Sequence, residues 1–177
     1  MQAGIATQLI TVGATLAGVV LTLIANAYLE GRRAREAREL ESVRLASEHA
    51  KWLRDERLKA YAGFSLAGEE VLQFLRSEML ALAGSSSAST RKATEARWSE
   101  LRTALRKAYN QVALFGAEEV RGVALQVWRI ARNGGNDFLR DLGSTPEAAA
   151  ELRDAVSRQG NAGDRFLDAC RASLQGE

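Results

Sequence analysis

Proline, histidine and cysteine are almost absent from this chain of 177 residues, which has one of each. A single proline permits long uninterrupted helices, because proline removes a backbone donor and breaks a helix interior. A lone cysteine excludes an intramolecular disulfide and suits a reducing compartment. The only histidine, His49, has no second histidine or cysteine at the spacing of a metal site, so we expect a solvent-exposed side chain there.

Strand signals and catalytic motifs are also missing. There is no sustained alternation of apolar and polar residues, and no Asn-Gly turn between β-branched runs. The chain lacks a phosphate-binding glycine loop and the Glu-x-x-His pattern of carboxylate-bridged metal bundles. Cys170 falls within an apolar stripe and is expected in the core. We therefore predict an all-α protein that is not an enzyme and that binds no metal or cofactor.

Charge does not single out a partner. The formal net charge is +2, and acidic and basic residues are interspersed along the chain. Arg121, Arg129 and Arg132 give one predicted helix a basic side, but Glu118 and Glu119 dilute it. Nucleic acid is therefore not the expected partner.

One long stretch without charge stands out, Gly4 to Leu29. At about 1.5 Å per residue in a helix, it is long enough to cross a hydrocarbon core of roughly 30 Å. A cleaved secretory signal and a buried core helix are the alternatives. Ala25-Asn26-Ala27 resembles a cleavage site, but no Lys or Arg precedes the apolar run, which is longer than that of a usual signal. We predict one retained transmembrane helix over residues 1–30.

Basic residues follow this stretch and do not precede it. The positive-inside rule then places the N-terminus outside the cell (inner) membrane and the bulk of the chain in the cytoplasm. The arginines can also attract anionic lipid headgroups, at about 1 kcal/mol per basic side chain near the surface. The predicted membrane-surface residues are Tyr28, Arg32, Arg33, Arg35 and Arg38.

Small and hydroxyl-bearing residues gather on one face of the predicted span, opposite a face of larger apolar residues. Small residues let two helix backbones approach closely, and hydroxyl and amide groups can hydrogen-bond across the contact. The predicted oligomer face consists of Thr11, Ala14, Thr15, Gly18, Thr22 and Asn26. The alternative is that glycine and alanine are simply common in membrane helices.

Residues 31–51 are dense in charges of both signs. Opposite charges recur at helical spacing, as in Arg32/Glu36 and Arg44/Glu48, and each exposed pair supports a helix by a few tenths of a kcal/mol at most. A thin apolar stripe leaves two interpretations, a solvated helical stalk and a parallel coiled coil between subunits. The stripe is poor in large residues, which favours the stalk.

Residues 52–177 have apolar residues at spacings of three and four, which predicts a bundle of about four helices. The first continues from the stalk to Leu82, with Gly68 expected at a close helix approach. A flexible loop should follow over Gly84–Ser89. The second helix should run from about Thr90 to Phe115 and end with Gly116 in a left-handed conformation. A kink at Gly116 within one long helix is the alternative.

The third helix is expected to end at Asn133–Asn136, with Phe138, Leu139 and Leu142 in the loop that follows. Ser144-Thr145-Pro146-Glu147 predicts the start of the fourth helix, because a hydroxyl side chain can cap it and proline is tolerated in its first turn. Gly160 and Gly163 weaken the middle of that helix and indicate a kink or close packing there.

Two segments resemble a known group of proteins. Trp52 to Phe64 has the pattern Trp-x-x-Asp-Glu-Arg-x-x-x-Tyr-x-x-Phe, and Leu114 to Val120 is the second segment. With the N-terminal span, they resemble uncharacterised single-pass, membrane-anchored helical-bundle proteins of actinobacterial type. The resemblance implies an anchor and a bundle. It implies no activity, cofactor or catalytic residue.

Three function classes follow from this organisation. The first is a membrane-anchored, self-associating assembly or interaction module without catalytic activity, with the lipid bilayer, further copies of the chain and a cytoplasmic protein as partners. The second is a homo-oligomeric pore, which the hydroxyl-bearing face would line. The third is a regulator that binds a lipid surface or nucleic acid through the arginines after the span.

Overall fold

The computed structural model describes residues 2–82, 87–141 and 146–175, without the side chains of Ala34, Pro146 and most residues before Tyr28. All elements in these residues are helical and none is a strand, as the sequence predicts. The elements are α1 (Gln2–Phe74), a π-helical segment η1 (Leu75–Met79), α2 (Leu80–Leu82), α3 (Ala88–Phe115), α4 (Glu118–Arg140) and α5 (Pro146–Gln175).

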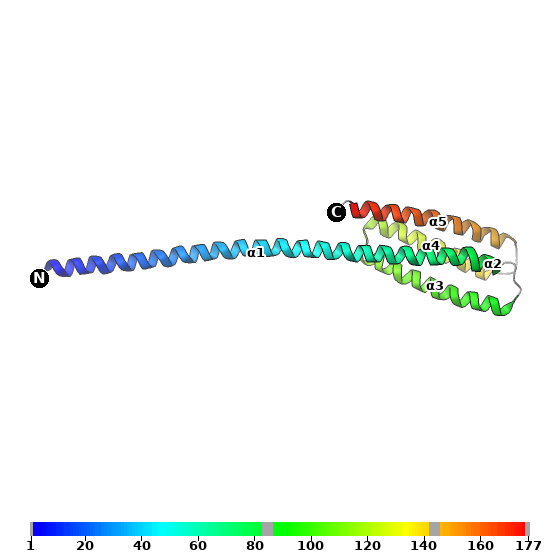
Figure 1. Cartoon of the computed structure of the whole chain (residues 1–177), viewed down its shortest axis with the longest axis horizontal. Helices are drawn as coiled ribbons and strands as arrows, with labels where there is room; N and C mark the ends of the chain where they lie inside the picture. The colour runs from blue at the N-terminus through cyan, green and yellow to red at the C-terminus, as the bar shows by residue number, and fades with distance from the viewer. Residues whose placement is uncertain (1, 83–86, 142–145, 176–177) are drawn as a thin grey trace. The chain divides into compact units, whose positions relative to one another are not determined.

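The chain divides into two units, Met1–Lys51 and Trp52–Glu177. We call the first the N-terminal helix unit and the second the bundle. Helix α1 contributes to both. Within the bundle, the last part of α1 with η1 and α2 packs beside α3, α4 and α5, which confirms the predicted bundle of about four helices (Figure 1).

No described side chain of the N-terminal helix unit is buried. Two predicted ion pairs are confirmed, between Arg32 Nε and Glu36 Oε1 at 2.9 Å and between Arg44 Nε and Glu48 Oε1 at 2.8 Å. All four side chains are exposed, so each pair adds only a few tenths of a kcal/mol to the helix. The exposed large apolar residues of this unit are Leu21, Leu23, Tyr28, Leu29, Leu40, Val43 and Leu45.

Among the described residues, no helix combines the length and the apolar character needed to cross a membrane. The transmembrane helix predicted for Gly4–Leu29 falls largely on residues whose side chains lie outside that description. It therefore stays a prediction.

The bundle core draws apolar side chains from every helix of the bundle. The ring centroids of Phe64 and Phe166 lie 4.8 Å apart, and the rings of Phe74 and Trp98 stack with 9° between their planes. Edge-to-face and stacked aromatic pairs stabilise a core beyond the area that they bury. The predicted core residues Trp98, Leu105, Val127 and Phe166 are buried, and Phe115 is half-buried.

The junction between α3 and α4 is held by side chains of α1. Arg57 Nε donates to the carbonyl oxygen of Phe115 at 3.0 Å, and the backbone N–H of Ala117 donates to Tyr61 Oη at 3.0 Å. Gly116 lies between them with φ −71° and ψ 154°, so the predicted left-handed cap is wrong. Because α1 supplies partners for the two helix ends, the glycine adopts an extended conformation instead.

The predicted end of the third helix at residues 133–136 is also wrong, because α4 continues to Arg140. The two glycines there allow close packing. A Cβ atom at Gly135 would lie 2.4 Å from the Trp98 ring, and one at Gly134 would lie 2.7 Å from an α5 side chain. The glycines thus bring α4 against its neighbours on two sides, and this packing outweighs their weak helix propensity.

Phe138 and Leu139, predicted in a loop, belong to α4, where Phe138 is buried and Leu139 is half-buried. Leu142, residues 84–86 of the predicted loop and the Ser144-Thr145 cap lie outside the described residues. The predicted loop extends too far, because Ala88 and Ser89 already belong to α3. Pro146 opens α5 as the sequence predicts.

The remaining glycines of the bundle differ from expectation. No atom of another element would lie within 4 Å of a Cβ at Gly68, so the predicted close helix approach is wrong. The same is true of Gly160 and Gly163, which lie within an unbroken α5. Neither a close approach nor a break in the helix explains these two residues.

Candidate interaction surfaces

The predicted oligomer face is described at three of its residues. Thr22 Oγ1 donates to the carbonyl oxygen of Gly18 at 2.8 Å, so this hydroxyl is satisfied within its own helix. Nothing would lie within 4 Å of a Cβ at Gly18, and Asn26 is exposed. The backbone at Gly18 is therefore open to a second helix. The side chains of Thr11, Ala14 and Thr15 lie outside the description.

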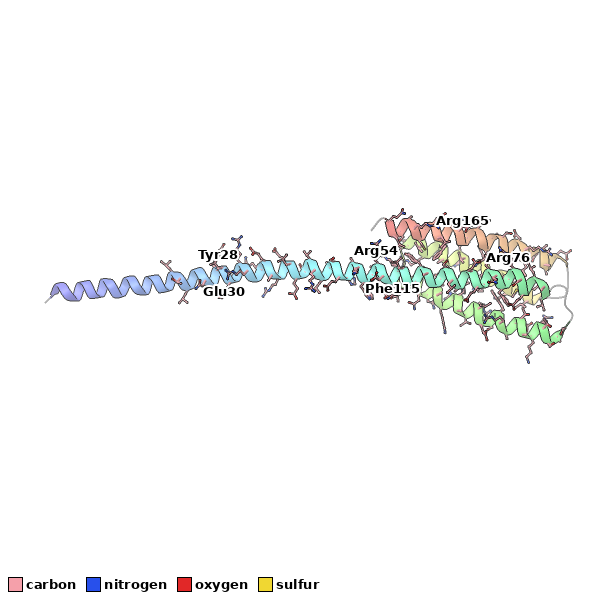
Figure 2. The ribbon with its side chains drawn as sticks, in the orientation of Figure 1. Tyr28, Glu30, Arg54, Arg76, Phe115 and Arg165 are labelled. Atoms are coloured by element: carbon pink, nitrogen blue, oxygen red, sulfur yellow. The ribbon has the colours of Figure 1, made fainter. Side chains whose placement is uncertain are left out.

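The predicted membrane-surface residues are all exposed. Tyr28, labelled on α1 in Figure 2, has 73% of its surface accessible. Arg32 is paired with Glu36 within the helix. The other three are Arg33, Arg35 and Arg38.

A second surface, between α3 and α4, was not singled out by the sequence analysis. The segments 101–117 and 120–136 contain no Asp or Glu, but they contain six basic residues. Trp128 lies beneath two of them, with the guanidinium carbons of Arg106 and Arg132 each 4.6 Å from its ring centroid. Tyr109 stacks beside Trp128 at 6.2 Å. We call Arg102, Arg106, Lys107, Tyr109, Trp128 and Arg132 the Trp128 cluster.

The Trp128 cluster has a surplus of positive charge. Two of its guanidinium groups bond to amides, Arg102 donating to Asn136 and Arg132 to Asn133. None of its basic groups pairs with a carboxylate of the described residues. Trp128 Nε1 is buried and has no hydrogen-bond partner among them. Unpaired donors and cations around an aromatic ring form a surface that favours anionic groups.

A sequence signal for this cluster does exist. Arg102 and Arg106 are spaced by four residues, as are Trp128 and Arg132, which places each pair on one helix face. The dilution expected from Glu118 and Glu119 does not occur, because these residues lie in the first turn of α4, away from the middle of the helix. When charge is summed over the whole of α4, the acidic first turn hides the excess of positive charge in the middle of the helix.

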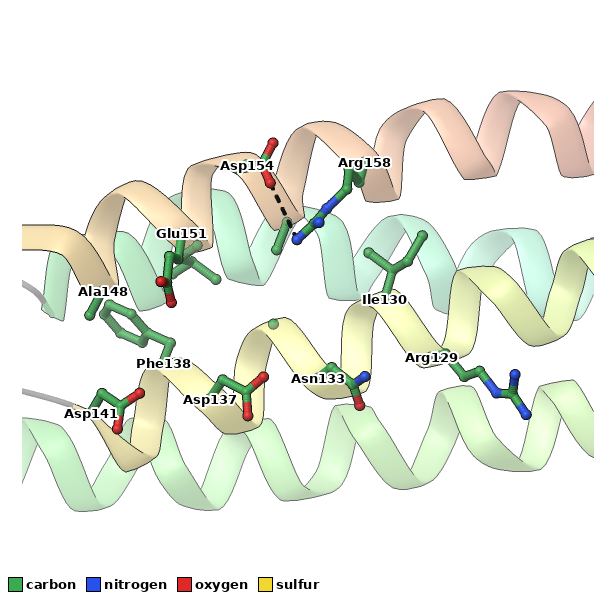
Figure 3. A pocket seen from close by; sticks show the side chains of 13 residues that line it. Arg129, Ile130, Asn133, Asp137, Phe138, Asp141, Ala148, Glu151, Asp154 and Arg158 are labelled. Carbon is green, nitrogen blue, oxygen red and sulfur yellow. Dashed lines mark ion pairs between the residues drawn. The ribbon is translucent and has the colours of Figure 1, made fainter.

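A groove with a volume of about 470 Å³ runs between α4 and α5 (Figure 3). Its carboxylates are exposed, and three are paired locally, Asp154 with Arg158 at 3.3 Å, and Asp137 and Asp141 with Arg140. Nowhere in the described part of the chain do three His, Cys, Asp or Glu side chains come close enough to hold a metal ion. The groove therefore offers neither metal ligands nor a buried acid or base.

Cys170 is buried, as predicted, and burial raises the pKa of its thiol to about 12. At neutral pH the thiol is protonated and is not a nucleophile. His49 is exposed, as predicted.

Comparison of the chain with protein-family models, with curated proteins and with solved structures gave no match. The resemblance to membrane-anchored bundle proteins stays a prediction.

Proposed function

We propose that this protein is a membrane-anchored, self-associating helical interaction module without catalytic activity. One observation carries the proposal: the N-terminal helix unit exposes large apolar side chains and buries none that the structure describes. Leu21 and Leu23 are 68% and 63% exposed, and Leu40 is 73% exposed. Helices in proteins owe most of their stability to the packing of an apolar face, so lipid or another chain should cover these residues.

We expect lipid to cover the first part of this unit and a second copy of the chain to cover the part that follows. Gly4–Leu29 carries no charge, which suits hydrocarbon, and the arginines after it suit the cytoplasmic headgroups. Beyond Glu30 the helix is too highly charged for hydrocarbon. Leu40 and Val43 are therefore better covered by the same stripe of another copy.

Self-association is tested by the mass of the full-length protein in mild detergent, measured by light scattering. Gly18→Leu should obstruct the close backbone approach and lower the mass, whereas Leu23→Ile, on the opposite face, should not. Thr22→Val should have little effect, because its hydroxyl bonds to its own helix. Because the Thr22 hydroxyl donates to its own helix, it gives no added support to a pore lined by hydroxyl groups. Equal masses for Gly18→Leu and wild type, or a monomeric wild type, would show that self-association is wrong.

Orientation is tested with an impermeant thiol reagent on intact cells. Gln2→Cys should react and Ser89→Cys should not, since the first is expected outside and the second in the cytoplasm. The buried Cys170 gives little background. The reverse labelling pattern would overturn the proposed orientation.

The proposed cytoplasmic partner is a protein with an acidic surface, bound at the Trp128 cluster. Carboxylates of the partner would pair with Arg106 and Arg132. A poly-glutamate peptide serves as the probe, titrated against the full-length protein at two salt concentrations. Arg106→Glu/Arg132→Glu should weaken binding at least tenfold, and Arg165→Glu on α5 should not. Binding of single-stranded DNA but not poly-glutamate would refute an acidic protein partner.

A further inference from the structure

A groove between the end of α1 and the middle of α5 has properties that packing does not explain. Its volume is about 280 Å³, close to the lower end of the roughly 300–1,000 Å³ usual for small-molecule sites. Its apolar wall includes Phe64, Leu72, Val127 and Phe166. Two of these, Phe64 and Phe166, are core residues in direct ring contact, so the groove reaches down to the core of the bundle.

Three glycines line this groove, Gly68 on α1 and Gly160 and Gly163 on α5. All three are half-buried, yet a Cβ at any of them would meet nothing within 4 Å. Gly135 differs, because a Cβ there would collide with Trp98. Glycine weakens a helix interior relative to alanine. In the folded bundle, these three glycines leave open the space that side chains would otherwise fill.

The groove also contains a buried polar group without a partner. Gln159 is only 2% exposed, and its Oε1 atom makes no hydrogen bond to any described residue. Buried polar side chains are almost always hydrogen-bonded. Trp98 follows this rule, since its Nε1 donates to Asn136 Oδ1 at 2.9 Å. Among the described residues, the other buried polar atom without a partner is Trp128 Nε1. Because Gln159 lines the groove, a rotation of its side chain would turn this unpaired acceptor toward a ligand that donates to it.

The groove has charged residues at its rim and a change of helix type beside it. Glu69, Asp164 and Arg76 lie on the rim, and the structure pairs none of them with another described residue. The two carboxylates outnumber the single guanidinium, which disfavours an anionic ligand. Arg76 belongs to η1, and π-helical segments occur frequently at functional sites.

We propose that this groove binds a small neutral or cationic organic molecule with an apolar ring and one N–H or O–H donor. The ring fills the space above Gly68, Gly160 and Gly163 and lies against the apolar wall. The Gln159 amide turns into the groove, and the donor bonds to its Oε1 atom. This inference does not depend on the membrane anchor or on the Trp128 cluster.

Indole and indene are the probes, because they have nearly the same shape but only indole has an N–H donor. Equilibrium dialysis of the full-length protein in lipid nanodiscs measures uptake at a known free concentration, and empty nanodiscs measure uptake by lipid. Wild type should bind one equivalent of indole, with a dissociation constant at least tenfold below that for indene. Gln159→Leu should bring the two constants within about twofold of each other.

Gly163→Leu should abolish uptake of both probes while the melting temperature stays level or rises, because the side chain enters open space. Gly160→Ala adds a single methyl group and serves if the leucine variant fails to fold; it should weaken indole binding several-fold. Gly122→Ala is the matched control, since this exposed glycine on α4 also has nothing within 4 Å but lies outside the groove. It should leave indole binding unchanged.

Three results would overturn the proposal. Uptake of indole no greater than by empty nanodiscs would show that the groove has no such ligand. Equal affinity of wild type for indole and indene would remove the role of Gln159. Unchanged uptake by folded Gly163→Leu would place the binding elsewhere.

Discussion

Helix α1 passes through two different environments. In the N-terminal helix unit, Leu40 and Val43 are 73% and 67% exposed, and no described side chain is buried. In the bundle, Phe64 and Val71 of the same helix are buried. The same secondary structure is thus stabilised in one region by neighbouring helices of the chain. In the other region nothing described within the chain covers the apolar side chains.

The difference follows from side-chain size and spacing. The bundle part of α1 has aromatic and large aliphatic residues at spacings of three and four, which is enough to form one side of a core. In the stalk, residues 31–51, apolar residues recur at similar spacings, but few of them are large. Its charged residues form ion pairs along the helix instead. Bundle stability should therefore respond strongly to core changes and hardly at all to changes in the N-terminal helix unit.

The largest expected effect is in the aromatic core. Phe166→Ala removes the ring that contacts both Phe64 and Tyr61, and it should lower the free energy of unfolding by about 3–5 kcal/mol. Leu40→Ala, which removes an exposed side chain, should change the unfolding of the bundle by less than about 0.5 kcal/mol. Urea titration followed by the fluorescence of buried Trp98 measures both. Similar losses for the two variants would mean that the units are not independent.

The next effect separates two kinds of glycine within the bundle. Gly135→Ala places a methyl group against the Trp98 ring and should destabilise by about 1–3 kcal/mol. Gly122→Ala meets no neighbour and should stabilise α4 by up to about 1 kcal/mol. Urea midpoints measure both. Opposite signs are expected, and a gain at Gly135 would contradict the close contact between α4 and α3.

A smaller effect is expected at the junction of α3 and α4. Tyr61→Phe keeps the ring but removes the oxygen that accepts from the Ala117 N–H, and should cost about 1 kcal/mol. The same urea titration measures the loss. Tyr109→Phe is the control, because the structure gives that hydroxyl no hydrogen bond to a described residue. Equal costs would remove the role of Tyr61 at the junction.

The smallest expected effect is the pH dependence that the Cys170 thiol gives to the stability of the bundle. Burial raises the pKa of this thiol to about 12, whereas an unfolded cysteine ionises near pH 8.5. The contribution is therefore fully present below about pH 8.5 and is lost as the pH rises toward 12, where the unfolded state gains by ionising. At pH 8, iodoacetamide should alkylate the native protein far more slowly than the urea-unfolded protein. Equal rates would show that the thiol is accessible.

The helical class, the size of the bundle and its core residues could be predicted from the sequence, because apolar spacing alone determines them. Trp98, Leu105 and Val127 are buried for this reason. The start of α5 at Pro146 was predictable from local chemistry.

The features that could not be predicted are those that depend on contacts between residues far apart in the sequence. Gly135 looks like part of a helix end until Trp98, from another helix, is placed against it. Gly116 does not adopt a left-handed cap, because Arg57 and Tyr61 of α1 supply the hydrogen bonds that such a cap would provide. Each of these outcomes depends on a neighbour more than thirty residues away.

The candidate surfaces show the same limit. The basic excess of the Trp128 cluster is visible in the sequence once charge is counted over short segments. The position of Trp128 between two arginines from different helices is not visible there, because it requires α3 and α4 to be adjacent. The groove beside Gln159 could not be predicted at all, because no sequence pattern near a glycine shows that the space around it is open in the folded bundle.

Residue-resolved hydrogen exchange on the full-length protein, with and without lipid nanodiscs, tests the contrast between the two units most directly. Amides of the bundle core, such as those of Val71 and Leu152, should be equally protected in both conditions. Amides over residues 4–29 should be protected only with lipid, because hydrocarbon would then surround them. Protection of this stretch that is the same with and without lipid would contradict the proposed membrane anchor.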